Sequence, residues 1–175
     1  MSRLTDLECH ALAHLDVNGP MSGYRLRTLF ASSPTNALSA GAGSIYPLLK
    51  RLEQRGFVIG KETGDGRGTR ILRCSGKGIK AAMRWIADTR DSGVLGEDGM
   101  RSRAYFIDRL SAAERKAWLE QSLQACQEKL LEVKRFKPLR EDSLGARWTT
   151  DHALRVTQAR IAWLQARLNE QNNEE

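Results

Sequence analysis

The stretch SIYPLLKRLEQRG, residues 44–56, carries the clearest structural pattern in this sequence. Its apolar residues recur three and four positions apart, which is the spacing of one face of an α-helix. These residues are Ile45, Leu48, Leu49 and Leu52. Pro47 is tolerated if Ser44 is the N-cap, because the N–H groups of the first turn have no intrahelical partner. We therefore predict a helix from Ser44 to Gly56 with one buried face.

The opposite side of this predicted helix is polar. At about 100° per residue, Pro47, Lys50 and Gln54 point away from the apolar face, flanked by Tyr46 and Arg51. Arginine and lysine can donate to guanine acceptors, and glutamine can pair with adenine. Most amphipathic helices, however, have a polar face that is simply solvated. This pattern alone therefore leaves both DNA reading and an ordinary surface open.

Two helices are expected before this segment. Thr5 and Glu8 have the spacing of a capping box, and Asn18-Gly19-Pro20 ends the helix that they start. A second helix starts at Ser22, a good N-cap, and ends at residues 32–34. Its buried stripe is formed by Leu26, Leu29 and Phe30.

A β-hairpin and a fourth helix are expected after it. Two β-prone runs, 57–63 and 70–74, flank the glycine-rich residues 64–68. The fourth helix begins near Ser75. Its predicted apolar stripe consists of Ile79, Ala82, Met83 and Ile86. Three helices, a hairpin and a helix in this order predict a winged helix-turn-helix at residues 1–88.

The C-terminal part reads as helical. Residues 89–98 are polar and glycine-rich, as in a linker, and residues 99–175 form the second predicted domain. A short helix near 101–110 precedes a capping box at Ser111 and Glu114. Two long helices then carry narrow apolar seams of the kind that pack helix against helix. The predicted dimerisation residues are Leu119, Leu123, Leu130, Leu154, Ile161, Leu164 and Leu168. Packing of these two helices against each other within one chain is an open alternative.

The charge of the chain is unevenly distributed. Its 175 residues carry a net charge of +7, and residues 1–91 hold 14 Lys+Arg against 8 Asp+Glu, whereas residues 92–175 hold 14 against 13. A basic domain fits a partner that carries phosphates, although many ordinary surfaces are mildly basic. No apolar run is long enough to span a bilayer and no secretory signal is visible, so we expect a cytoplasmic protein. The cysteines Cys9, Cys74 and Cys126 are far apart, which favours reduced, buried thiols.

Catalytic motifs are missing from the sequence. His10 and His14 are four residues apart, but the intervening Ala-Leu-Ala excludes an HExxH metal motif. There is no P-loop, no GxGxxG and no GxSxG pattern. We therefore expect no enzyme, no cofactor and no metal site.

The chain resembles the PadR family of transcriptional regulators. The resemblance rests on Gly19–Tyr24, Gly43–Glu53, Gly56, Gly66-Arg67, Ser75 and Gly78. Residues 104–111 and the helices after them resemble the C-terminal domain of the longer PadR proteins. The resemblance implies a mainly α fold with a small hairpin wing, a homodimer built by the C-terminal helices, and binding to a palindromic promoter site in double-stranded DNA. Some relatives bind aromatic small molecules, so it also suggests an effector near Trp85, Trp118, Trp148 and Trp163, for which ordinary packing is the simpler explanation.

Three residues depart from the family pattern. Arg25 replaces an acidic residue, Leu72 replaces an aromatic residue in the returning wing strand, and Cys74 replaces a leucine. These changes concern a helix cap and the packing of the wing rather than the residues expected at DNA.

We predict base contacts by Lys50 and Gln54, and phosphate contacts by Tyr46 and Arg51. Ser22 at a helix N-terminus suits another phosphate. The full predicted DNA-binding set is Ser22, Tyr24, Arg25, Ser44, Tyr46, Pro47, Lys50, Arg51, Gln54, Arg67 and Arg70. Arg67, at the tip of the wing, is expected in the minor groove, or else is only a mobile loop charge.

The sequence thus predicts a DNA-binding transcriptional regulator, more specifically a repressor that occupies a promoter as a homodimer. The alternative is a winged helix that serves as a protein-interaction module. A metal-dependent sensor would require ligand clusters that the sequence lacks.

Overall fold

A computed structural model describes residues 3–34, 38, 42–63, 69–90, 92–94, 96 and 98–174. The chain divides into two compact units, Met1–Val94 and Leu95–Glu175, each with its own internal packing.

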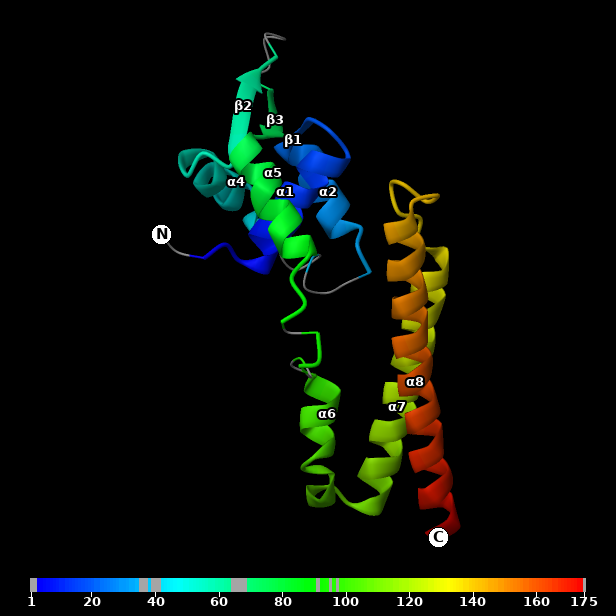
Figure 1. The fold of residues 1–175 in the computed structure, drawn as a ribbon. Coiled ribbons are helices and arrows are strands. Elements are labelled where there is room, and N and C mark those ends of the chain that lie inside the picture. Colours follow the sequence, from blue (N-terminus) through cyan, green and yellow to red (C-terminus); the bar gives the residue numbers. More distant parts are fainter. Residues whose placement is uncertain are drawn as a thin grey trace. The chain divides into compact units, whose positions relative to one another are not determined.

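The first unit has the predicted order of elements (Figure 1). Its helices are α1 (Asp6–Val17), α2 (Gly23–Ala31), α4 (Ile45–Gln54) and α5 (Gly76–Ile86), with a 3₁₀ turn at Ala42–Ser44. Its strands are β1 (Met21–Ser22), β2 (Val58–Glu62) and β3 (Arg70–Cys74). The antiparallel β2–β3 hairpin pairs Val58 with Cys74 and Glu62 with Arg70. The predicted winged helix, mainly α with a small hairpin wing, is confirmed.

The short strand β1 was not predicted. Met21 and Ser22 pair with Leu72 and Ile71 of β3, so the sheet has the order β1-β3-β2 and β2 lies at its edge. Two residues are too few to show the alternation of a strand, which explains why the sequence pattern does not reveal it.

Local signals set the ends of these helices as expected. Thr5 and Glu8 form the predicted capping box of α1, and the Ser22 hydroxyl accepts a hydrogen bond from the Arg25 N–H at 3.2 Å. Gly56 follows α4 with a φ of 74°, in the left-handed region that glycine adopts without strain. Ser44 precedes α4, but its side chain makes no capping hydrogen bond.

The core of this unit closes around the predicted apolar faces. Leu12 of α1, Phe30 of α2 and Leu52 of α4 are fully buried. Two of the residues that depart from the family pattern, Leu72 and Cys74 of β3, are buried in this core. The Cys74 thiol donates to the Leu12 carbonyl at 3.2 Å, and burial raises the pKa of this thiol to about 11.

The predicted apolar stripe of α5 is largely wrong. Of its four residues only Ala82 is buried, whereas Ile79, Met83 and Ile86 are exposed. α5 approaches the core through small residues instead. A Cβ added at Gly78 would lie 2.2 Å from the Phe57 carbonyl oxygen, so this side of the helix has no room for large side chains.

The second unit is a helical hairpin preceded by short helices. It comprises α6 (Gly99–Ala104), a 3₁₀ turn at Ile107–Arg109, α7 (Ala112–Arg135) and α8 (Leu144–Glu174). α7 and α8 lie side by side (Figure 1). The predicted capping box at Ser111 and Glu114 starts α7. Asp98, the N-cap of α6, accepts a hydrogen bond from Arg160 of α8 at 2.8 Å.

The α7–α8 hairpin buries little. Leu119, Val133 and Leu164 are buried. The other residues of the predicted seams are half-buried: Leu123, Leu130, Leu154, Ile161 and Leu168. Cys126 is half-buried as well, whereas Cys9 and Cys74 are buried as expected.

Candidate nucleic-acid interface

A groove on the first unit runs between the N-terminus of α2, one side of α4 and strand β3. Its walls include Gly23, Leu49, Glu53, Thr69 and Leu72. It also brings together six residues of the predicted DNA-binding set, from three segments that are distant in sequence. These six are Ser22, Tyr24, Tyr46, Lys50, Gln54 and Arg70.

The amphipathic pattern of α4 explains this arrangement. Its apolar face is buried in the core, and this orientation turns Tyr46, Lys50 and Gln54 toward the groove. Tyr46 is 53% exposed, so its hydroxyl and ring edge are available to a ligand. Ring, ammonium and amide groups on one helix face can together contact phosphates and base edges.

The other polar side of α4 faces helix α1. Arg51 Nε lies 3.6 Å from Glu8 Oε1, and Arg55 Nη1 lies 3.5 Å from Glu8 Oε2. Glu8 is only 3% exposed, and one of its carboxylate oxygens also accepts the Thr5 N–H at 3.0 Å. This buried acid therefore links α4 to the N-terminal end of α1.

The remaining predicted DNA residues do not line the groove. Arg25, Ser44, Pro47 and Arg51 are exposed around it but are not among its wall residues. Arg67 lies outside the described residues.

The start of α2 is packed tightly against α4. A Cβ added at Gly23 would lie 3.1 Å from Cε1 of Tyr46, so the absence of a side chain lets the two helices approach. Tyr24 is 67% exposed beside it. The N–H groups and positive dipole end of a helix favour an anion at this position, which suits a DNA phosphate.

Glu53 is a groove residue that the sequence analysis missed. Its carboxylate accepts Arg70 Nη1 on Oε2 at 3.0 Å and Arg70 Nη2 on Oε1 at 2.7 Å. Helix periodicity could have placed Glu53 beside the predicted DNA-binding residues, because Glu53 is seven residues from Tyr46 and therefore shares its helix face. Its partner on another element could not be inferred from helix periodicity.

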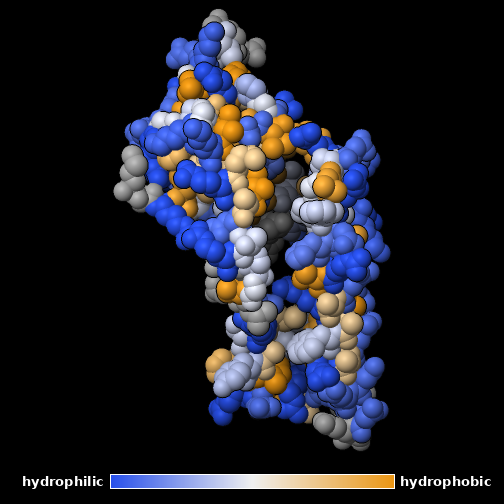
Figure 2. Space-filling view, viewed as in Figure 1, coloured by the Kyte–Doolittle hydropathy of each residue, from blue (hydrophilic) through white to orange (hydrophobic). Residues whose placement is uncertain are grey.

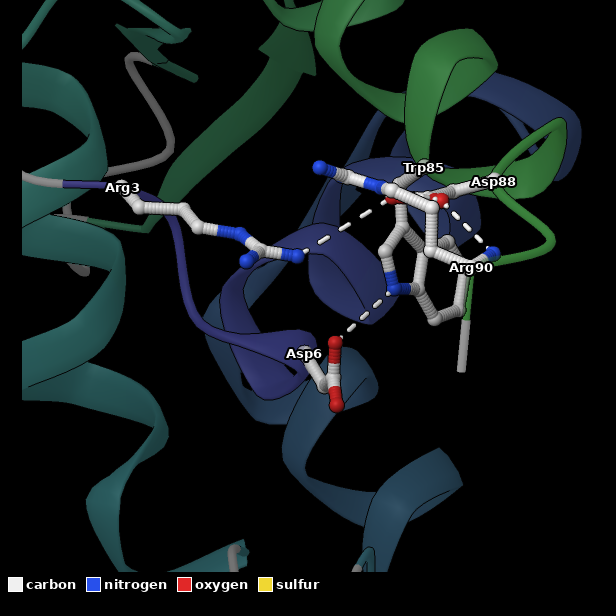
Figure 3. Close-up of polar contacts among 5 residues, drawn as sticks. All are labelled: Arg3, Asp6, Trp85, Asp88 and Arg90. Carbon is white, nitrogen blue, oxygen red and sulfur yellow. Dashed lines mark hydrogen bonds and ion pairs between the residues drawn. The ribbon is translucent and has the colours of Figure 1, made fainter. Parts of the chain in front are cut away.

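A second polar cluster lies away from the groove, where α5 ends near the start of α1 (Figure 3). The Trp85 indole N–H donates to Asp6 at 3.0 Å, and Arg3 lies 3.9 Å from Asp88. Hydrogen bonds from Arg90 hold the pKa of Asp88 well below its usual range. This cluster links both ends of the winged helix, and Trp85 belongs to its internal packing.

Trp85 also belongs to an aromatic group. Its ring meets His10 edge-on at 5.2 Å, and His10 and His14 both pack near Phe30. Among the described residues, no three His, Cys, Asp or Glu side chains gather into a metal-binding group. No helix in the described ranges is long and apolar enough to cross a membrane.

Comparison with known proteins identifies the first unit. Residues 11–82 match the Transcriptional regulator PadR-like family. Over 126 residues the chain is 27% identical to the Negative transcriptional regulator PadR of Bacillus subtilis (strain 168). The aligned residues cover 71% of this chain and 69% of that protein.

Solved structures share the fold over nearly the whole chain. Bacillus subtilis PadR in complex with operator DNA superposes with a TM-score of 0.80 at 21% identity, over 97% of this chain and 99% of that one. The same protein in complex with p-coumaric acid gives a TM-score of 0.77 at 23% identity, over 95% and 98%. The PadR-like regulator BC1756 from Bacillus cereus gives 0.79 at 17% identity, over 97% and 98%. Residues 11–82 thus match the PadR-like family of transcriptional regulators, and the chain shares the fold of solved PadR structures over nearly its whole length.

Proposed function

We propose that this regulator is a repressor that binds a palindromic promoter site as a homodimer and responds to a small-molecule effector. The groove between α2, α4 and β3 carries the proposal, because it gathers Ser22, Tyr46, Lys50 and Gln54 on one concave surface of a basic domain. Such a protein acts on chromosomal DNA, so we propose that it is cytoplasmic.

In this proposal α4 enters the major groove. Lys50 and Gln54 contact base edges, since they stand at the centre of its exposed face. Tyr46 and Ser22 bind phosphates on the α2 side of the groove, and Arg25 and Arg51 bind phosphates outside it. Arg67, which lies outside the described residues, is proposed to contact the minor groove. The same surface includes Tyr24, Ser44 and Pro47, whereas Arg70 receives a different role below.

We assign residues 1–88 to DNA binding, 89–98 to a linker and 99–175 to dimerisation. One small winged helix contacts too little DNA for genomic specificity, and a two-fold pair reading two half-sites is the usual solution. The second unit must then present an apolar surface to a second copy of the chain.

Helix α8 has two apolar faces. Leu154, Ile161 and Leu164 lie on the face that packs on α7, where they are buried or half-buried. On the opposite side Trp148 is 69% exposed and Trp163 is 39% exposed, with Leu144 and Val156 beside them. Figure 2 shows hydrophobic residues scattered among hydrophilic ones on the visible side of the hairpin. We propose that the seam leucines hold α7 to α8 and that the tryptophan face carries the second copy.

One relative, Bacillus subtilis PadR, supports the finer parts of the proposal. The curated Bacillus subtilis protein is a negative regulator, which favours repression. Structures of the same protein contain operator DNA and p-coumaric acid, which favours a DNA operator and a small aromatic acid as classes of ligand for this chain.

Selection of bound sequences from a random duplex library tests this function. The purified full chain is expected to enrich an inverted repeat whose half-site centres lie about one helical turn apart. Lys50→Ala is expected to weaken binding to the enriched duplex by about 1–3 kcal/mol. Enrichment of no sequence, or of a single half-site without symmetry, contradicts the proposal.

A further inference from the structure

An acidic side chain stands in the groove that we propose for DNA. Glu53 is on α4, and its side chain is 30% exposed. A carboxylate facing a phosphate backbone is repelled unless a cation compensates it. Arg70 supplies that cation through two parallel hydrogen bonds of 3.0 and 2.7 Å, a fork that is stronger and more directional than a single contact.

The fork joins three elements of the winged helix. Glu53 belongs to α4, Arg70 is the first residue of β3, and the Glu53 carboxylate also accepts the Gly60 N–H of β2 at 3.1 Å. Because β2 is an edge strand, its outward N–H groups have no strand partner, and Glu53 satisfies one of them. The contact therefore ties the middle of β2 and the start of β3 to helix α4.

Gly60 provides the space for this contact. A Cβ added at this position would lie 2.6 Å from Arg70 Nη2 and 2.7 Å from Glu53 Oε1. Both atoms are ends of side chains that can move, so a methyl group here displaces the fork rather than the backbone. Glu53, Gly60 and Arg70 depend on one another, and we call these three residues the wing clamp.

The charges of the wing clamp cancel. The hydrogen bonds from Arg70 lower the pKa of the Glu53 carboxyl, and the same bonds raise the pKa of the Arg70 guanidinium. Both groups therefore stay ionised at neutral pH. Lys50 lines the same groove without an ion-pair partner among the described residues, so its charge is available to DNA.

We infer that the wing clamp positions the hairpin against α4, and that Arg70 serves this purpose instead of binding phosphate. The inference rests on the proposed DNA-binding function and refines it. A fixed angle between the wing and α4 determines which base edges α4 contacts when the wing contacts a given position in the minor groove. Loss of the wing clamp should therefore reduce sequence preference more than general affinity for DNA.

The test compares binding to two duplexes over a range of salt concentrations. One is the duplex that the wild-type chain enriches from the random library, and the other is a scrambled duplex of the same composition. The variants are Gly60→Ala, which keeps both charges, and Glu53→Ala/Arg70→Ala, which keeps the net charge. Lys50→Ala shows the effect of losing an uncompensated cation, and Gly76→Ala is the matched glycine control, since a Cβ there meets nothing within 4 Å.

Both wing-clamp variants are expected to lower the preference for the enriched duplex by about fivefold or more, the effect of one lost base contact. The salt dependence on the scrambled duplex should stay at the wild-type slope, whereas Lys50→Ala lowers it by about one. Gly76→Ala should match wild type. Melting temperatures establish that each variant is folded, and Gly60→Ala carries the test if the double variant is not.

Two results overturn the inference while leaving the proposed function intact. One is an unchanged sequence preference in Gly60→Ala. The other is a salt slope that falls by about one in the double variant, because Arg70 would then be a phosphate ligand. If the wild-type chain enriches no duplex, the proposed function fails and the inference falls with it.

Discussion

The two units of this chain bury their apolar residues to different extents. In the winged helix, α1, α2, α4 and the sheet close around one core that includes Leu12, Phe30 and Leu52. In the helical hairpin, two long helices share only a narrow buried seam, and Trp148 is left exposed on its outer side. The first unit closes a core within a single chain, although Ile79, Met83 and Ile86 of α5 stay exposed. The second unit has no comparable core and carries the apolar surface that we propose for pairing. Stability and assembly should therefore respond to different substitutions.

The largest effect is expected in the core of the winged helix. Phe30→Ala removes a fully buried ring and should lower the free energy of unfolding of this unit by about 3–5 kcal/mol. Urea unfolding followed by circular dichroism and by amide exchange measures the loss. Val94→Ala, at a residue that is 67% exposed, should change stability by less than about 0.5 kcal/mol. Equal effects of the two substitutions would remove the contrast between core and surface.

The next largest effect concerns assembly. Trp148→Ala/Trp163→Ala should weaken the proposed dimer by roughly 2–4 kcal/mol, because exposed tryptophans at the centre of an interface contribute most of its energy. Sedimentation over a range of concentrations measures this change. The melting of the winged helix should stay at the wild-type value. Leu139→Ala, an exposed leucine between α7 and α8, is the control. A double variant that pairs as tightly as wild type would place the interface elsewhere.

A smaller effect is expected from acid. Burial lowers the pKa of His14 to about 4, with a further contribution from His10, whose own pKa is also lowered by burial. The unfolded chain therefore binds more protons than the folded one between pH 6.5 and about 4. Stability should be complete above pH 6.5 and fall through this window, by on the order of 2 kcal/mol for His14. Thermal melting at several pH values measures the slope.

His14→Gln should flatten this pH dependence in the winged helix. His152→Gln, at an exposed position of α8, should leave it unchanged. An equally steep loss of stability in acid after the His14 substitution would assign the effect to other groups.

The smallest effect is expected at the cluster of Figure 3. Trp85→Phe keeps a ring beside His10 but removes the indole N–H that donates to Asp6 at 3.0 Å. The winged helix should lose about 0.5–1.5 kcal/mol, the usual net value of one hydrogen bond. Asp6→Ala removes the acceptor of this hydrogen bond, and in the double variant the two losses should be less than additive. Additive losses would show that the two side chains act separately.

Much of the fold follows from periodicity and capping. Thr5 with Glu8, and Ser111 with Glu114, mark two helix starts correctly, and the face that begins at Ile45 is buried as expected. These signals are local, so a sequence carries them in full. The predicted resemblance to PadR regulators is confirmed by the family match over residues 11–82, and with it the prediction of a transcriptional regulator rather than an enzyme.

What the sequence did not predict depends on contacts between distant segments. The exposed face of α5 reflects the close approach of Gly78 to Phe57, which apolar periodicity alone misassigns. The pairing of Arg70 with Glu53 brings together residues that are 17 positions apart on different elements. An arginine in the wing suggests a cation that binds DNA, and only the geometry shows that Glu53 already compensates the charge of Arg70.

Titration of the purified full chain into a labelled double-stranded DNA of random sequence tests the central claim most directly. The excess of cations in the winged helix and the uncompensated Lys50 in its groove predict binding at low salt that weakens as salt increases, and a weaker salt dependence in Lys50→Ala. A folded chain with its pairing intact that binds no duplex at low salt would contradict a DNA-binding role for this groove.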